Sequence, residues 1–388
     1  MKRIFLLLMI TLSFNLGANQ LAVKDKLIVT NCMYEKLENL ATLIARTDKY
    51  TLIDVEMNEY VLSVLHDNRR DCGGFLNLEP YQKQQINENQ LLINLTKSRA
   101  TSGRDEYRII HDTQITPLLK QIDRNNLWGY MQHLTNYVNR AAKSQTGVWA
   151  AQWFKERIDS MAKDYHRNDV QSYLVATGKK YKQPSVVAVI GKDKPGGAVV
   201  IGAHIDTLKG NMPGADDDAS GIAAILEVSR MLLSSGINFD HPIYVIAYAA
   251  EEQGLVGSGF VVQSFLDKKI AVKAVLQFDQ AGFRANPKDN TIWLLDDYVD
   301  SNLTKFLAKL TTHYVNIPVS YTHCGYACSD HANWHLNGFP ACYPSATTLD
   351  DDNDNMHTSN DRLETISLDH LENFTKLGLA FAVELALN

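Results

Sequence analysis

A histidine and several carboxylates stand close together in one short stretch of the chain. His204 and Asp206 come directly after the apolar run 197–203, and three consecutive aspartates follow at positions 216–218. Three carboxylates side by side repel one another, and they are costly to hold near a core unless a positive group compensates them. We therefore interpret the stretch 202–221 as half of a site for a divalent cation.

The same acidic run also fits a solvated turn. In that alternative, Asp217 or Asp218 caps the helix predicted from Ala219 onward. Short acidic runs before helices are common, so this stretch alone leaves both interpretations open. Polar residues elsewhere in the chain favour the metal site.

Those other polar side chains mostly follow apolar runs of strand length. Glu251 and Glu252 come after the run that ends at Ala250, and Asp279 ends another such run. His357 lies in a polar loop, where a single histidine is more often an ordinary surface residue. Several coincidences of this kind are hard to explain by chance. Histidine and carboxylate ligands without nearby cysteine are typical of a catalytic zinc site.

The number of candidate ligands bears on the number of metal ions. Five candidates exceed what one open tetrahedral site needs, which predicts two ions about 3.5 to 4 Å apart that share a carboxylate. One glutamate of the pair 251–252 then remains free to act as a base toward the attacking water.

These side chains need a scaffold that brings strand ends together. The apolar runs 185–190, 198–201, 243–249 and 274–278 have the length of buried strands. Helical patterns separate several of them, so we expect an α/β sheet with helices on both faces. Such sheets bind ligands beyond the carboxyl ends of their strands.

The predicted helices include one with two tryptophans. Trp149 and Trp153 are spaced i,i+4, and we expect them to pack in the core against the sheet. The helix-like segments are 117–122, 127–142, 147–161, 221–233 and 303–314.

The composition is that of an ordinary soluble enzyme. The chain has 388 residues, of which 45% are hydrophobic, and its net charge of −6 gives no reason to expect a nucleic acid partner. Residues 1–18 have the order of a secretory signal peptide: a basic start, a short apolar stretch and small residues. That stretch is shorter than the roughly 20 residues needed to span a membrane. We expect a secreted monomer without a membrane anchor.

Residues 19–105 differ from the rest of the chain because they lack glycine-rich loops and pairs of metal ligands. Tyr34–Ile44 has a helical apolar period and Tyr50–Met57 has the pattern of a strand, which predicts a small α+β module. The link 97–104 is polar, basic and rich in small residues, as in exposed connections that proteases cut. We expect a removable pro-region that acts as an intramolecular inhibitor or chaperone, followed by a catalytic domain at 106–388.

Five motifs together resemble the secreted bacterial leucyl aminopeptidases of the two-zinc kind, in peptidase clan MH. They are His204-Ile-Asp206-Thr, 213–224, 248–258, the stretch from Cys324 to His331, and His357-Thr. The resemblance covers about residue 115 to the C-terminus. It implies the α/β/α sandwich of zinc peptidases, with a mixed, mostly parallel central sheet, and zinc-dependent removal of N-terminal residues from peptides.

The resemblance also implies a ligand set for two Zn²⁺ ions. Asp217 would bridge both ions. Glu252 and His357 would complete one site, and His204 and Asp279 the other.

Three further residues receive roles from the same resemblance. Glu251 would be the general base, and Asp206 would hold the ring of His204 from behind. Tyr326 would help to stabilise the reacting carbonyl oxygen. The family further implies a non-proline cis peptide bond between Asp217 and Asp218.

The chain has five cysteines, and an even subset should pair in an exported protein. By the resemblance, Cys324 and Cys328 match a disulfide beside the active site. Cys32 and Cys72 could join within the pro-region, which leaves Cys342 over. A metal site at the Cys-x3-Cys pair lacks further sulfur partners nearby.

The chain departs from the family in the pocket for the N-terminal side chain, which well-known members line with methionine and aromatic residues. Three of the matching positions here are polar, and Asp352 belongs to an acidic run that also fits a solvated loop. We expect a preference for large hydrophobic residues, with lysine and arginine second. The predicted pocket residues are Gln280, Leu295, Tyr343, Ser345, Leu349 and Asp352.

Three alternatives share this fold. A glutaminyl-cyclase-like enzyme would use a single zinc ion, and the presence of both His204 and Asp279 argues against it. A carboxypeptidase would need a basic clamp for the substrate carboxylate, which the sequence does not reveal. A non-catalytic binding domain would lack metal ligands, and here none is missing.

Overall fold

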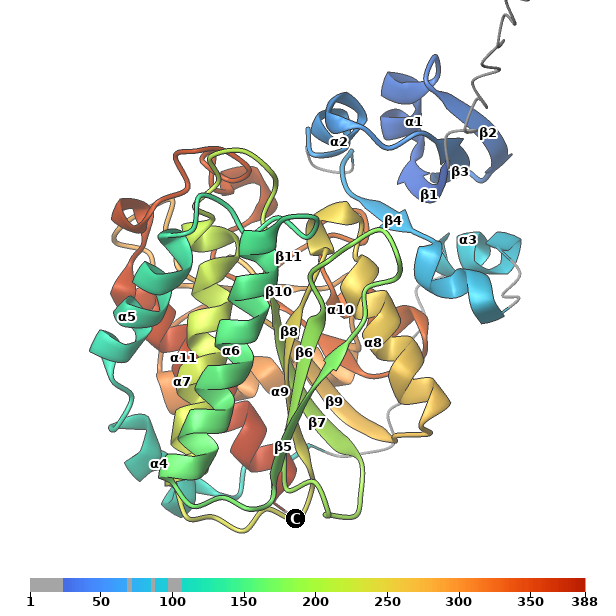
Figure 1. Ribbon diagram of the computed structural model, residues 1–388. Coiled ribbons are helices and arrows are strands. Elements are labelled where there is room, and N and C mark those ends of the chain that lie inside the picture. Colours follow the sequence, from blue (N-terminus) through green and yellow to red (C-terminus); the bar gives the residue numbers. More distant parts are fainter. Residues whose placement is uncertain (1–23, 68–71, 85–87, 97–106, 388) are drawn as a thin grey trace, which may run out of the picture.

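The computed structural model describes residues 24–67, 72–84, 88–96 and 107–387. We call residues 24–96 the N-terminal module and residues 107–387 the main domain (Figure 1). The predicted signal peptide and the whole predicted link lie outside the described residues, so both stay predictions. Among the described residues, no helix has the length and apolar character needed to cross a membrane.

The N-terminal module is a four-stranded antiparallel sheet with short helices, in the strand order β2-β3-β1-β4. A disulfide between Cys32 and Cys72 joins α1 to the segment before β4, a pairing that the sequence left open. The elements are β1 (Asp25–Thr30), α1 (Asn31–Leu37), β2 (Ala41–Arg46), β3 (Tyr50–Val55), α2 (Glu59–Leu65), β4 (Phe75–Asn77) and α3 (Glu88–Thr96).

One prediction for the module is wrong and one is confirmed. The helix expected over Tyr34–Ile44 stops at Leu37, because residues from Ala41 onward pair with β3. Hydrogen bonding within a sheet outweighs the helical period of a short segment. The strand expected from Tyr50 is β3.

The main domain contains a six-stranded mixed sheet in the order β12-β9-β7-β8-β6-β5. Its pairs β12–β9, β9–β7 and β7–β8 are parallel, and β6 pairs antiparallel with both β8 and β5. The mostly parallel α/β fold is therefore confirmed. The strands are β5 (Val170–Val175), β6 (Ser185–Ile190), β7 (Ala198–His204), β8 (Ile243–Tyr248), β9 (Val272–Gln277) and β12 (Ala341–Cys342).

Helices cover both faces of this sheet. Figure 1 shows α5, α6, α7 and α11 on one face and α8 and α10 on the other. A smaller sheet, in the order β11-β10-β13, lies beside it. The helices are α4 (Asp112–Leu119), α5 (Arg124–Thr135), α6 (Gln145–Asp164), α7 (Gly221–Ser234), α8 (Val256–Asp267), α9 (Ser301–Leu310), α10 (His331–Leu336) and α11 (Leu368–Ala386). The small sheet comprises β10 (Ile292–Leu295), β11 (Val319–Thr322) and β13 (Pro344–Ser345).

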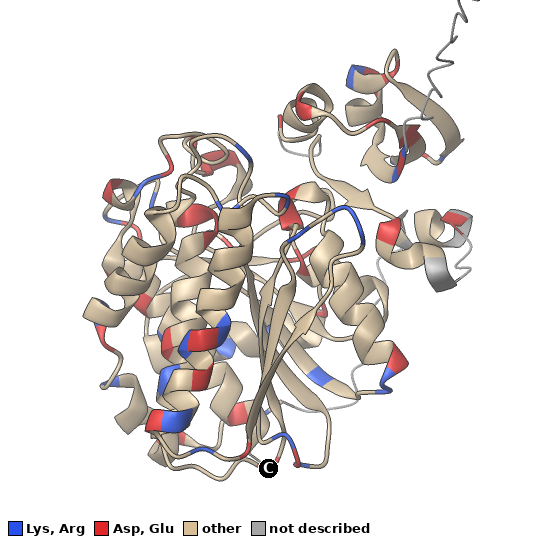
Figure 2. Cartoon of the chain, in the orientation of Figure 1, with Lys and Arg blue, Asp and Glu red and all other residues tan. Residues whose placement is uncertain are grey.

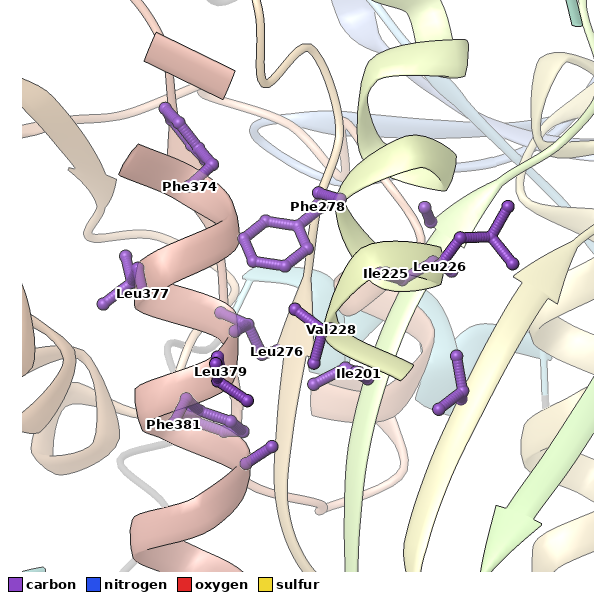
Figure 3. Close-up of a cluster of buried hydrophobic side chains, with 14 of the residues drawn as sticks. Ile201, Ile225, Leu226, Val228, Leu276, Phe278, Phe374, Leu377, Leu379 and Phe381 are labelled. Atoms are coloured by element: carbon purple, nitrogen blue, oxygen red, sulfur yellow. The ribbon is translucent and has the colours of Figure 1, made fainter. Parts of the chain in front are cut away.

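The alternation of side chains along β7 explains why both faces are apolar. Val199 and Ile201 enter the core beneath α7 and α11, whereas Ala198 and Val200 enter the core beneath α8. A strand buried on both sides needs apolar residues at every position. Figure 3 shows the first of these cores, where Phe278 lies between α7 and α11.

The prediction that both tryptophans of α6 lie in the core is wrong for Trp149. Trp149 is 50% exposed, and Trp153 is partly buried and stacked on His133. The buried face of α6 consists of smaller residues and Phe154, because the helix packs closely on the sheet. Both signs of charge are interspersed along α6 (Figure 2), as on an ordinary solvated face.

The N-terminal module docks where β8 ends. The backbone N–H of Asn77 in β4 donates to the carbonyl of Gly254 at 3.0 Å. Gly254 has φ +89°, and a Cβ there would lie 2.6 Å from the Phe75 ring, so glycine permits this close approach. The module therefore covers one end of the main sheet.

Candidate metal centre and active site

Three neighbouring strands deliver polar residues to the covered end of the sheet. His204 is the last residue of β7, a 3₁₀ turn at Glu251–Gln253 comes just after β8, and Asp279 comes just after β9. Since β7 runs parallel to both neighbours, the three carboxyl ends meet at the same edge. Backbone geometry alone thus gathers residues that are far apart in the sequence.

Two groups of side chains are close enough to hold a metal ion. Each group offers three ligand atoms that lie within 4.8 Å of one another. The groups are His204, Asp218 and Asp279, and His66, Glu252 and His357.

Asp217 lies between the two groups. Its Oδ1 is 2.8 Å from Nε2 of His204, and its Oδ2 is 3.1 Å from Nε2 of His357. Asp218 is engaged differently, because its two oxygens accept the backbone N–H groups of His204 and Gly221. The peptide bond between Asp217 and Asp218 is cis, as the resemblance implied.

The charge of this site fits divalent cations. Oε2 of Glu252 and Oδ1 of Asp279 are buried and have no hydrogen-bond partner within the described part of the chain. Burial raises the pKa of Glu252 to about 7, and burial together with neighbouring carboxylates raises the pKa of Glu251 well above its usual range. Nε2 of His357 lies 3.3 Å from Oε2 of Glu252, and Nε2 of His204 lies 3.7 Å from Oδ1 of Asp279. So many carboxylates in a dry site require further compensating positive charge. The histidine and carboxylate donors suit zinc.

Asp206 holds the turn that carries both glutamates. Its Oδ1 accepts the N–H of Glu251 at 2.9 Å, and its Oδ2 accepts the N–H of Glu252 at 3.3 Å. Oδ1 also lies 3.5 Å from Nδ1 of His204. Asp206 therefore lies beside the ring of His204 and also contacts the glutamate pair.

A cavity borders the two candidate metal-binding groups. Glu251 and Tyr326 line it together with all the residues predicted to contact the substrate side chain. The wall is mixed, with apolar side chains beside an amide, a hydroxyl and a carboxylate. The predicted pocket residues in this wall are Gln280, Leu295, Tyr343, Ser345, Leu349 and Asp352.

Within the acidic run 350–354, Asp352 differs from its neighbours. Asp350, Asp351 and Asp354 are exposed, whereas Asp352 lines the cavity. Burial raises the pKa of Asp352 to about 6, and nearby carboxylates add to the effect. The solvated-loop alternative therefore describes most of the run but not Asp352.

Cysteine pairing in the main domain agrees with the expectation. Cys324 and Cys328 form a disulfide, and both line the cavity. Cys342 is a free, buried thiol in β12.

The sequence analysis missed two residues that position the Asp217 loop. Asp361 accepts the N–H groups of Asp216 and Asp217 at 2.9 and 3.0 Å. Arg140, which is fully buried, donates to the carbonyl oxygens of Ile205, Pro213 and Gly214.

Arg140 was missed because the end predicted for its helix was wrong. The sequence predicted a helix over 127–142, but α5 ends at Thr135, and Arg140 lies in the following loop. No spacing or motif links Arg140 to the aspartates in the sequence.

The N-terminal module also reaches the cavity. Leu65, His66, Gly74 and Phe75 line it beside the residues of the main domain. Nε2 of His66 lies 2.9 Å from the carbonyl oxygen of Glu252. Burial and the neighbouring His357 lower the pKa of His66 to about 3. No pattern around His66 indicated a role in the site.

Comparison with known proteins identifies the family. The model of peptidase family M28 matches residues 185–382. The chain belongs to peptidase family M28. Leucine aminopeptidase 1 from Pyrenophora teres f. teres is 34% identical over 308 residues, which are 75% of this chain and 78% of that protein. The resemblance to the leucyl aminopeptidases is confirmed.

Two solved structures of Legionella pneumophila proteins are similar to this M28 peptidase over nearly its whole length. LapB superposes with a TM-score of 0.91 at 57% identity and covers 94% of this chain and 100% of its own. The LapA aminopeptidase superposes with a TM-score of 0.88 at 42% identity and covers 95% of this chain and 99% of its own. Both similarities extend beyond the main domain into the N-terminal module.

Proposed function

We propose that this zinc-dependent aminopeptidase hydrolyses the first peptide bond of peptides by means of two zinc ions that share Asp217. The observation that carries the proposal is the position of Asp217, whose two oxygens face His204 and His357 on opposite sides. A carboxylate in that position is suited to bridge two ions. Glu252 and His357 would complete one site, and His204 and Asp279 the other.

The chain's own residues supply the proton transfers. Glu251 accepts a proton from the attacking water and delivers it to the leaving amine. Asp206 accepts the backbone N–H of Glu251 and so fixes the turn that carries it, and Glu251 lines the cavity beside the candidate ligands. The hydroxyl of Tyr326 donates to the carbonyl oxygen as negative charge develops there. When bound, zinc supplies a Lewis acid for the carbonyl and a site for the free amine.

The cavity supports a preference for large hydrophobic N-terminal residues such as leucine and phenylalanine. Leu295, Tyr343 and Leu349 provide the apolar wall, and each buried methylene of a substrate contributes about 0.8 kcal/mol. Lysine and arginine are the second choice, because their apolar stems fit the same wall and their charge would meet Asp352.

We further propose that the protein is secreted as a monomeric precursor that keeps its N-terminal module over the site. Two disulfides suit an oxidising compartment. The module lines the cavity with four residues, which supports its predicted role as an intramolecular inhibitor or chaperone.

A glutaminyl-cyclase-like enzyme with a single zinc is less consistent with the site. It has no need for a second group of ligands on the far side of Asp217. A non-catalytic binding domain is also disfavoured, because the candidate ligands and Glu251 are all in place.

The decisive experiment measures hydrolysis of a leucyl anilide by protein cleaved in the link at 97–104, together with its zinc content. We expect about two zinc ions per chain, loss of activity with a chelator and recovery with added zinc. Full activity in chelator would overturn the metallopeptidase assignment, and a single bound zinc in active protein would overturn the two-ion proposal.

The substrate preference is tested by comparing kcat/KM for leucyl, phenylalanyl, lysyl and arginyl anilides. Replacing Asp352 by asparagine should lower kcat/KM for the basic substrates about 10-fold, while the leucyl anilide changes little. Ser345→Ala is the matched control, since it changes the same wall without removing a charge. A basic preference that survives Asp352→Asn would exclude this carboxylate as its source.

A further inference from the structure

We propose that His66 of the N-terminal module is itself a ligand of the metal centre, on the ion held by Glu252 and His357. This inference rests on the metal site of the proposed function. It adds a ligand that comes from outside the main domain, and it gives the module a specific chemical means of closing the site.

The geometry of His66 is that of a ligand. Its ring nitrogen belongs to a group whose three ligand atoms lie within 4.8 Å of one another, the same criterion that the group around His204 meets. Nε2 of His66 is 3.6 Å from Oε2 of Glu252, and the ring centroids of His66 and His357 are 4.4 Å apart. Oε2 of Glu252 is one of the buried oxygens without a hydrogen-bond partner among the described residues.

The module holds His66 in this position from several directions. The residue caps the carboxyl end of α2, and its backbone N–H donates to the carbonyl of Leu62. Its ring packs edge-on against Phe75, which in turn lies against Gly254 beside the glutamate turn. A side chain that is 90% buried and fixed by both its helix and its neighbour is preorganised for ligation.

Ligation by His66 would close the cavity at its reacting end. His66 lines the same cavity as Glu251, Tyr326 and Asp217, so a peptide whose amine approaches this ion must displace it. The affinity of the module for the main domain would therefore depend on bound metal. A module that merely fills space would show no such dependence.

A competing explanation is that His66 only hydrogen-bonds to the carbonyl of Glu252, at 2.9 Å. His66→Gln separates the two explanations. The glutamine side chain has comparable reach and keeps an N–H donor for that carbonyl, but it lacks the imidazole that zinc binds well. His133→Gln is the matched control, because His133 lies on α5 and stacks on Trp153.

The test counts imidazole ligands by X-ray absorption at the zinc edge of the full-length protein. Wild type and His133→Gln should show the three imidazoles of His66, His204 and His357, and His66→Gln should show one fewer. A chelator should remove zinc about 10-fold faster from His66→Gln than from wild type. His66→Asn repeats the count if the glutamine variant fails to fold.

Equal imidazole counts in zinc-loaded wild type and His66→Gln would overturn this inference and leave the aminopeptidase proposal intact. A full-length protein that takes up no zinc at the residues of the main domain would instead overturn the proposed function. The zinc content, measured separately on each sample, keeps these two failures distinguishable.

Discussion

The main domain and the N-terminal module both line one cavity, but their hydrophobic cores are very different. The candidate ligands of the main domain follow strands that are buried on both faces. The module has a small core around Leu27, Met33 and Ile53 and relies on a disulfide. Small domains bury too little apolar surface to be stable without such a staple.

We propose that the main domain carries out the reaction and that the module controls access to its cavity. Proton transfer and metal binding need groups held within fractions of an ångström, which a large, close-packed core provides. Closing a cavity needs only a unit that fits it and can leave. We therefore expect substitutions in the main domain to change turnover, and substitutions in the module to change access.

The largest expected effect is that of Glu251→Gln. A neutral amide cannot take the proton of the attacking water, so kcat should fall about 10²- to 10⁴-fold while zinc content is unchanged. The measurement is hydrolysis of a leucyl anilide by cleaved protein, with Glu156→Gln on the exposed side of α6 as control. Near-normal turnover would show that the base is misassigned.

The second effect concerns the core of the module. Replacing Cys32 and Cys72 by serine opens a loop with a sequence separation of 40, which should lower the module's free energy of unfolding by about 4 kcal/mol. Calorimetry should then show the module unfolding at a lower temperature than the main domain. If both regions still melt in one transition at an equally lowered temperature, they form a single cooperative unit. That result would contradict the description of two regions with separate cores.

A third, smaller effect tests the fit between the two regions. A Cβ at Gly74 would lie 2.3 Å from the ring of Tyr326, and its φ of +60° costs other residues about 1 to 2 kcal/mol. Gly74→Ala should therefore loosen the module and raise the activity of full-length protein about 10-fold. Gly236→Ala has a similar φ of +68° but open space around it, so it controls for backbone strain. If full-length Gly74→Ala is no more active than full-length wild type, the contact between Gly74 and Tyr326 does not help to close the cavity.

The smallest effects come from ion pairs between the regions. Lys209 lies 2.9 Å from Glu59, and both side chains are more than two-thirds exposed. Lys209→Met should change module binding by less than about 1 kcal/mol, an effect that salt removes. Lys180→Met should cost more, because its partner Asp25 is largely buried. The measurement is the activity of each full-length variant as a function of salt concentration. A larger effect for Lys209→Met than for Lys180→Met would contradict this ranking.

Much of the main domain was predictable because its signals are local. Apolar runs of strand length identified β6, β7, β8 and β9, and their ends located the candidate ligands. Motifs with fixed order indicated the family, which the comparisons confirm. The roles of His204, Glu251 and the other site residues remain predictions.

Other features could not be predicted from the sequence because they depend on residues that are far apart in the chain. Trp149 has the residue type and spacing of a core position, but the sheet lies against a neighbouring stripe of α6. Arg140 and Asp361 act on backbone groups that are distant in the sequence. Hydrogen bonds to backbone leave no residue pattern that spacing could reveal.

By itself the sequence determined the α/β class, the peptidase family and the residues that the strand ends bring together. Each of these depends on residue type and short-range order, which set strand burial and motif identity. The sequence left open whether Asp352 faces the cavity, and it gave no sign that His66 enters the cavity from the module; only the tertiary structure decided both. Both depend on distances between chain segments that are far apart in the sequence, and these distances are set by packing in the folded chain.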